Sequence, residues 1–166
     1  TNGVIEDRQV GSIVGDDLIT NGTFDTDTDW TLGTGWTISG GTLNANITAG
    51  SLVSQSGMGF ANDETYIYSF EIKNYVSGSI RLGDAHNVWN TASADGVVSG
   101  ETTLSGGPGD LVYFSTTLSF VGSIDNVFIY EVRNDLDITD VEIVKDGSYA
   151  AKFDGQDSKV DTGTDM

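Results

Sequence analysis

The sequence contains no cysteine, which excludes disulfide bonds, thiolate catalysis and sulfur-ligated metal sites. It has one histidine, no Gly-x-Ser-x-Gly elbow and no glycine-rich loop ending in Gly-Lys-Ser/Thr. A nucleophile–base pair is therefore hard to build, and we predict that the chain is not an enzyme. No apolar run reaches the roughly 18 residues of a membrane span, so we expect no membrane insertion.

Basic residues are also scarce. Seven Lys and Arg stand against 25 Asp and Glu, which gives a formal net charge of −18. Nucleic acid and anionic lipid are attracted by clustered Lys and Arg, so we expect neither as a partner. An acidic surface of this kind suits two purposes equally: solubility in a crowded or salty setting, or binding of calcium through oxygen ligands.

Glycine is abundant, with 22 residues, and Thr, Ser, Asn and Asp separate short runs of Val, Ile, Tyr and Phe. This composition predicts many short strands joined by tight turns. The clearest strand covers residues 65–75, where Tyr66, Tyr68, Phe70 and Ile72 share one face. Further strands are expected at 36–40, 42–47, 78–83, 110–120 and 125–132. The pattern is typical of an all-β sandwich, with a jelly roll and an immunoglobulin-like fold as the two main alternatives.

Composition shifts near both ends divide the chain. We predict an N-terminal arm or linker at residues 1–16, a core domain at 17–132, and a linker with the start of a second β domain or a C-terminal arm at 133–166. Because the sequence begins at Thr1 and ends in a charged stretch, we expect it to be a piece of a longer chain.

Two segments carry a resemblance to a known family. The opening "DLITNGTFDTDTDWTLGTGWTISGGTL" resembles the start of calcium-binding carbohydrate-binding modules of families four, nine and twenty-two, and "FVGSIDNVFIYEV" resembles their closing strand. The resemblance implies a jelly-roll β-sandwich of two antiparallel sheets with flanking extended arms. It also implies a non-catalytic module that binds a glycan or host surface polysaccharide.

The middle segments "SIRLGD" and "GDLVYFSTTLSFVGSIDNV" extend the likeness to modules of bacteriophage tail fibres and other virion proteins. That likeness implies a virion or an extracellular cell-surface location, with other virion or surface subunits as partners and homo-oligomers as a further option. Separately, "DGSYAAKFDGQDSKVDTG" resembles the first strands of a laminin G or concanavalin-like domain.

The stretch "TFDTDTDW" places Asp25, Asp27 and Asp29 at positions 1, 3 and 5 of an EF-hand loop. Position 6 is Trp30 instead of glycine and position 12 is Trp36 instead of glutamate, so the EF-hand is excluded. The family resemblance implies a different, structural calcium site, made by Asp25, carbonyl groups around Gly40 and Gly41, and Asp125. The alternative is that the first three aspartates are solvated turn residues and Asp125 pairs with backbone amides.

A carbohydrate site needs an exposed aromatic ring beside polar groups. The stretch "RLGDAHNVWNT" supplies such a set, and we predict ligand contacts from Arg81, Asp84, His86, Asn87 and Trp89. The alternative is that Trp89 packs under a loop and His86 is an ordinary surface residue. Trp30 and Trp36 are expected in the core.

Three functions follow from these patterns. The first is a calcium-stabilised module, of the phage fibre or decoration type, that adheres to glycans. The second is a purely structural capsid or fibre subunit that makes protein–protein contacts. The third is an accessory sugar-binding module of a secreted glycoside hydrolase, which requires a catalytic domain elsewhere in the parent chain.

Overall fold

A computed structural model describes residues 12–133 and two further strands at 141–145 and 149–153. Residues Ser12–Arg133 form one compact unit, and the two later strands belong to another. Within the described residues there is no helix long and apolar enough to span a membrane. The first unit is the sandwich domain discussed below.

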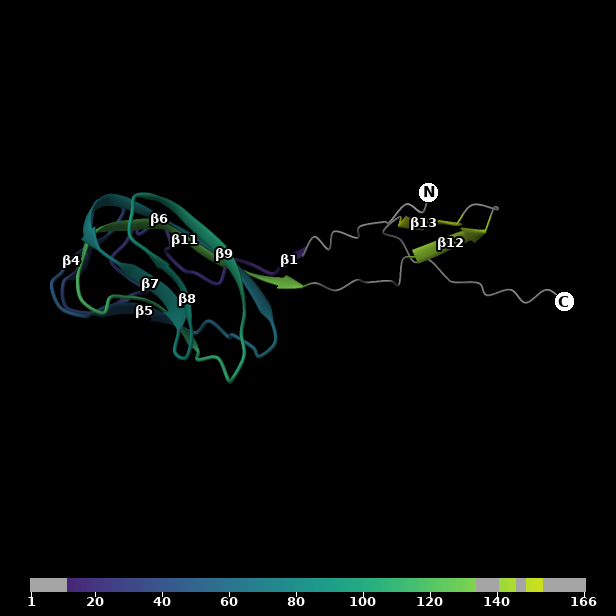
Figure 1. Ribbon diagram of the computed structural model, residues 1–166, viewed down its shortest axis with the longest axis horizontal. Helices are drawn as coiled ribbons and strands as arrows, with labels where there is room; N and C mark the ends of the chain where they lie inside the picture. Colours follow the sequence, from purple (N-terminus) through teal and green to yellow (C-terminus); the bar gives the residue numbers. More distant parts are fainter. Residues whose placement is uncertain (1–11, 134–140, 146–148, 154–166) are drawn as a thin grey trace. The chain divides into compact units, whose positions relative to one another are not determined.

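The sandwich domain consists of two antiparallel sheets, which confirms the predicted fold class (Figure 1). The six-stranded sheet has the order β3-β4-β11-β6-β9, and β1 also pairs with β11. The five-stranded sheet has the order β2-β5-β10-β7-β8. The strands of the six-stranded sheet are β1 (Ser12–Val14), β3 (Trp36–Ile38), β4 (Leu43–Ile47), β6 (Thr65–Gly78), β9 (Gly96–Thr103) and β11 (Phe120–Arg133). Those of the five-stranded sheet are β2 (Thr31–Leu32), β5 (Leu52–Ser56), β7 (Ile80–Asp84), β8 (Val88–Ala92) and β10 (Leu111–Ser115).

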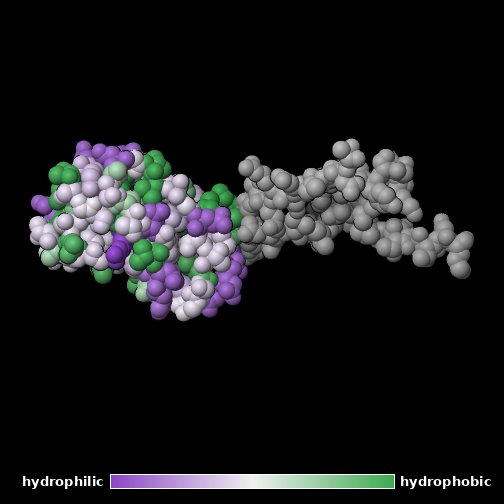
Figure 2. All heavy atoms as spheres, viewed as in Figure 1, coloured by the Kyte–Doolittle hydropathy of each residue, from purple (hydrophilic) through white to green (hydrophobic). Residues whose placement is uncertain are grey.

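Side chains from both sheets meet in one core. The predicted alternation of β6 is confirmed, because Tyr66, Tyr68, Phe70 and Ile72 are all at most 3% exposed. The Phe70 ring packs edge-on against Phe114 of β10, with ring centroids 5.1 Å apart. On the surface, hydrophobic and hydrophilic residues are interspersed over the face of the domain that Figure 2 displays.

The opening segment of the domain lies along the closing strand. Ser12–Val14, which the sequence places in the N-terminal arm, form β1 and pair with Glu131–Arg133 of β11. The Leu18 amide then donates to the Ile129 carbonyl at 2.9 Å, and the Val127 amide donates to the Gly22 carbonyl at 3.0 Å. The segment therefore joins β11 through backbone hydrogen bonds.

The aspartate-rich stretch forms a loop anchored by apolar rings at its two ends. Phe24 and Trp30 are 1% and 7% exposed, and their ring centroids lie 5.5 Å apart. Asn21 organises the loop, since its Nδ2 donates to the carbonyls of Thr26 and Thr28 at 2.8 and 3.1 Å. The three aspartates of the loop are exposed, as expected for solvated turn residues: Asp25, Asp27 and Asp29.

The remaining described strands, β12 (Val141–Lys145) and β13 (Tyr149–Phe153), pair antiparallel as a hairpin. They fall in the region that resembles the start of a laminin G or concanavalin-like domain. That identity stays a prediction. Residues 1–11 and the remaining parts of 134–166, which the sequence assigns to arms and a linker, lie outside the described residues.

Candidate functional site

Asp84 ends β7 and holds the turn to β8. Its Oδ1 accepts the backbone N–H groups of His86 and Asn87 at 2.6 and 2.8 Å, and its Oδ2 accepts the indole N–H of Trp89 at 3.2 Å. The Asn87 side chain donates to both carboxylate oxygens at 3.3–3.4 Å. Asp84 is 0% exposed. Its carboxylate positions the turn, and direct contact with a ligand stays a prediction that this burial does not favour.

The pKa of Asp84 results from two opposing effects. Burial alone would raise the pKa, because it disfavours the charged form. The hydrogen bonds from His86, Asn87 and Trp89 favour the carboxylate and together lower the pKa below its ordinary value of 3.8. Asp84 is therefore ionised at neutral pH, and the donors of the turn stabilise its charge.

The other residues of this turn that were predicted to contact a ligand differ in their exposure and contacts. His86 is exposed, and the Asn87 amide is engaged by Asp84. Trp89 is partly buried in an aromatic cluster, with its ring centroid 5.4 Å from Phe60 and 5.8 Å from Tyr68. The alternative for Trp89, packing under a loop, agrees with these contacts better than stacking on a ligand does.

Arg81 lies on the outer face of the five-stranded sheet, beside a residue that the sequence analysis did not single out. Val112 and Phe114 of β10 point into the core at 0% exposure, so Tyr113 points outward. Tyr113 pairs with Gly83 of β7, and Arg81 pairs with Ser115 of β10. Both side chains are partly exposed and share one face.

Gly83, next to Tyr113, allows other groups to approach β7 closely. A Cβ atom at Gly83 would clash with the Asn87 carbonyl oxygen and lie 3.0 Å from the Tyr113 hydroxyl, so both groups lie over this position. Burial is the largest effect that raises the Tyr113 pKa; the Asp84 carboxylate raises it further, and Arg81 opposes the rise. The phenol therefore stays protonated at neutral pH and keeps both a hydrogen-bond donor and an acceptor.

Arg81 and Tyr113 also have unused hydrogen-bonding groups. In the described part of the chain, neither side chain makes a hydrogen bond or an ion pair. The other cation with a described side chain, Lys73, is by contrast paired with two carboxylates. We call the outer surface around Arg81, Gly83 and Tyr113 the Arg81–Tyr113 face.

The residues predicted to bind calcium have other local roles. Gly40 and Gly41 have φ angles of 66° and 70° at the centre of the β3–β4 hairpin. Positive φ at both central positions is typical of a type I′ turn, which favours glycine. Asp25 accepts a hydrogen bond from the Thr23 hydroxyl at 2.8 Å.

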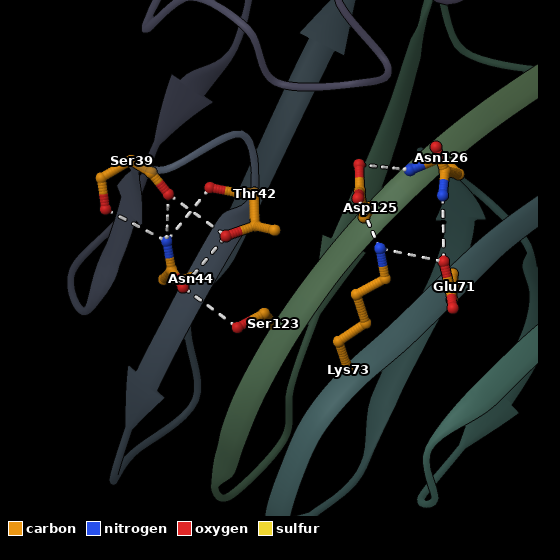
Figure 3. A network of polar contacts seen from close by, with 8 residues as sticks. All are labelled: Ser39, Thr42, Asn44, Glu71, Lys73, Ser123, Asp125 and Asn126. Atoms are coloured by element: carbon orange, nitrogen blue, oxygen red, sulfur yellow. Dashed lines mark hydrogen bonds and ion pairs between the residues drawn. The ribbon is translucent and has the colours of Figure 1, made fainter.

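Asp125 is neutralised by a side chain of this chain (Figure 3). The Lys73 ammonium lies 2.8 Å from Asp125 Oδ2 and 3.2 Å from Glu71 Oε2. The Asn126 amide N–H donates to Asp125 Oδ1 at 2.8 Å, and its side chain donates to Glu71 at 2.9 Å. We call Glu71, Lys73, Asp125 and Asn126 the Lys73 network. In a separate group that Figure 3 also draws, the Ser123 hydroxyl donates to Asn44 at 3.0 Å.

This arrangement does not fit a calcium ion at Asp125, because calcium requires six to eight oxygen ligands and an ammonium already contacts the carboxylate. Among the described residues, no group of three or more His, Asp or Glu could hold a metal ion. No hydrogen bond or ion pair of these residues joins Asp25, Gly40 or Gly41 to Asp125. Calcium binding stays a prediction that these contacts do not favour.

We therefore expect the melting temperature of the protein to differ by less than about 1 °C between excess calcium and excess EDTA, because the described residues form no cluster of acidic ligands that would couple calcium to folding. Differential scanning calorimetry of the wild type measures this directly. Asp125→Asn serves as the control. A calcium-dependent rise in melting temperature that disappears in this variant would establish the metal site.

The fold is similar to that of carbohydrate-binding modules of known structure. No protein-family model matches the sequence, and neither does any curated protein. Among solved structures, a family 4 carbohydrate-binding module has a TM-score of 0.50 at 15% identity, covering 68% of this chain and 99% of that one. A family 22 xylan-binding domain from Paenibacillus barcinonensis has a TM-score of 0.47 at 15% identity, covering 74% and 98%. A variant of a family 29 carbohydrate-binding module gives 0.49 at 14% identity, covering 73% and 92%.

The similarity to the family 4 module shows a shared β-sandwich fold. It covers nearly the whole of that module, so the matching part of this chain corresponds to a complete sandwich. The expected likeness to carbohydrate-binding modules is thus confirmed for the fold. At this identity the match transfers no ligand and no site residue, so the binding chemistry has to be argued from the residues of this chain.

Proposed function

We propose that the sandwich domain is a non-catalytic carbohydrate-binding module that attaches a virion or cell-surface protein to glycans through the Arg81–Tyr113 face. The observation that carries the proposal is that two partly exposed side chains with unused hydrogen-bonding groups, Arg81 and Tyr113, share the outer face of adjacent strands. The shared fold with carbohydrate-binding modules supports it.

The chemistry of the face suits a sugar. The apolar side of a pyranose ring stacks on a flat aromatic ring such as that of Tyr113, while its hydroxyls accept hydrogen bonds from the Arg81 fork. Ser54 and Ser115 lie on the same face and supply small polar groups. The strongly negative net charge disfavours polyanionic glycans, so we expect neutral ligands.

The absence of catalysis is part of the proposal. The single histidine, His86, is exposed, and its one hydrogen bond within the described residues is the backbone donation to Asp84. No serine or threonine hydroxyl of that part of the chain pairs with its imidazole. The Arg81–Tyr113 face has groups that can bind a sugar, and no nucleophile–base pair lies beside it among the described residues.

Arg81→Met should weaken binding to neutral polysaccharides by about tenfold, the equivalent of ~1.4 kcal/mol, because it removes the guanidinium donors and keeps the apolar stem. An array of immobilised neutral polysaccharides, including xylan and mixed β-glucan, measures retention. Glu101→Gln, an exposed change on β9 of the other sheet, is the matched control. Equal retention of wild type and Arg81→Met, or no retention of any neutral polysaccharide, would count against the proposal.

A structural role in a capsid or fibre is the second candidate, and one observation favours it. Leu52 and Val88 are each 50% exposed and lie on the same outer face as Tyr113. Exposed apolar side chains of this kind suit contacts with a protein subunit, including a second copy of this chain. Light scattering across a concentration series tests this role: an oligomer that Leu52→Glu converts to a monomer would support it.

A further inference from the structure

The two longest strands, β6 and β11, pair along most of their length, but two irregularities interrupt their register. One lies between Val121 and Ser123, opposite Asn74–Val76, and the other lies between Asp125 and Phe128. Each contains an asparagine with positive φ, 53° for Asn74 and 52° for Asn126. Bulges of this kind redirect side chains and are enriched beside binding sites.

The first bulge opens a groove on the outer face of the six-stranded sheet, with a volume of about 480 Å³. Its lining includes Thr37 of β3, Asn46 of β4 and Asn74 of β6. The side chains of Asn46 and Asn74 are exposed and make no hydrogen bond to the described residues. Contacts of the next residue fix the bulge, since the Tyr75 amide donates to Asp95 at 2.8 Å.

The second bulge opens a groove of about 420 Å³ on the same outer face. Phe128 and Tyr130 of β11 line it with ring centroids 5.5 Å apart, and Val97 of β9, 70% exposed, lies on the opposite side. Ser69 and Asn126 add polar groups. The carboxylates of Asp17 and Glu71 also line this groove, which therefore combines aromatic surface with hydroxyl, amide and carboxylate groups.

The Lys73 network lies between the two bulges along the strands, because Lys73 directly precedes Asn74 and Asp125 directly precedes Asn126. At about 3.3 Å per residue, the five steps from Gly122 to Val127 separate the bulges by roughly 16 Å. Lys73 is shared by two carboxylates, so it has no charge to spare for an anionic ligand. The Lys73 network is polar and carries excess negative charge, because its two carboxylates share one ammonium.

We infer that the outer face of the six-stranded sheet is a second ligand-binding surface, which takes a linear, uncharged saccharide of several units across both bulge grooves. The amides of Asn46 and Asn74 exchange hydrogen bonds with sugar hydroxyls in the first groove. The ring of Tyr130 supports a sugar ring in the second groove. Glu71 and Asp125 exclude polyanions, and the inference does not depend on the Arg81–Tyr113 face, which belongs to the other sheet.

The test separates the two faces. Full-length protein is titrated by isothermal calorimetry with cellohexaose, xylohexaose and laminarihexaose. Asn74→Gly removes the amide while keeping the positive φ, and Tyr130→Ala removes the ring, with Tyr130→Phe as the variant that preserves it. We expect the Tyr113→Ala variant to retain saccharide binding. Adding Asn74→Gly or Tyr130→Ala to that variant should weaken the binding at least tenfold. Adding Tyr130→Phe instead should leave it unchanged.

Three outcomes would overturn the inference. In the first, Tyr113→Ala alone abolishes all saccharide binding, which leaves the proposed function intact and removes the second face. In the second, none of the three hexasaccharides binds. In the third, the face binds a cationic peptide such as hexalysine in a Tyr130-dependent manner and binds no saccharide. Conversely, binding that depends on Tyr130 but not on Tyr113 would support the second face and contradict the proposed role of the Arg81–Tyr113 face.

Discussion

Asp84→Ala is expected to lower the free energy of unfolding by about 3–5 kcal/mol, because it removes a fully buried carboxylate and leaves three partly buried donors without an acceptor. The donors are the backbone N–H groups of His86 and Asn87 and the indole N–H of Trp89. For a domain of this size the loss corresponds to a fall of roughly 10–20 °C in melting temperature. Urea unfolding followed by tryptophan fluorescence gives the free energy.

Two controls identify the cause of this loss. Asp84→Asn keeps one acceptor oxygen and should lie between the alanine variant and the wild type. Asp27→Ala, at an exposed position on another loop, should have little effect. If Asp84→Ala were as stable as Asp27→Ala, the β7–β8 turn would not depend on the carboxylate.

The same carboxylate predicts a pH dependence. The folded pKa of Asp84 is lowered from 3.8, so its charge contributes stability that is complete above the unfolded pKa. That contribution is lost as the pH falls through the lower, folded pKa. The stability difference between wild type and Asp84→Asn should therefore be constant near neutrality and shrink between about pH 4 and pH 2. A difference that stays constant down to pH 2 would show that the charge is not what the turn requires.

Tyr113→Ala is expected to produce the largest loss of binding on the Arg81–Tyr113 face, at least about thirtyfold or ~2 kcal/mol for the strongest neutral glycan bound by that face. The variant removes the aromatic surface on which a sugar ring would stack. Tyr113→Phe should retain most of the affinity, since only the hydroxyl is lost. Calorimetric titration of the glycan found on the array measures the three dissociation constants.

The fold of the variant must be unchanged for this result to count. Tyr113 is partly exposed, so circular dichroism and melting temperature should change little. Leu118→Ala, at a loop position 77% exposed, serves as a control at a more exposed position on a different surface. Equal affinity of Tyr113→Ala and Leu118→Ala would remove Tyr113 from the site.

The fold was predictable because hydrophobic alternation is a local signal. The period-two pattern of residues 65–75 predicted that Tyr66, Tyr68, Phe70 and Ile72 share one face. All four are buried in the structure. The burial of Trp30 and Trp36, at 7% and 4% exposure, was likewise predicted. The β1 strand was missed because Ser12–Val14 pair with residues near the other end of the domain, which no local pattern reveals.

The candidate site was only partly predictable, for two physical reasons. In β10 both alternating sets contain apolar residues, so the sequence could not tell that Val112 and Phe114 face the core and Tyr113 faces outward. Asp84 looked like a ligand residue because its hydrogen-bond donors, two of them backbone amides, are invisible in a residue pattern. Arg81 was singled out as a candidate by its polar neighbours, and its ligand role stays a proposal.

The most direct test of the Arg81–Tyr113 face is an NMR titration of the protein with the strongest neutral oligosaccharide from the array, followed through backbone amide shifts. Saturable shifts of Arg81, Gly83, Tyr113 and Ser115 amides, with fitted affinities that agree with calorimetry, are the predicted result. Saturable binding that leaves these amides unshifted would contradict the proposed function.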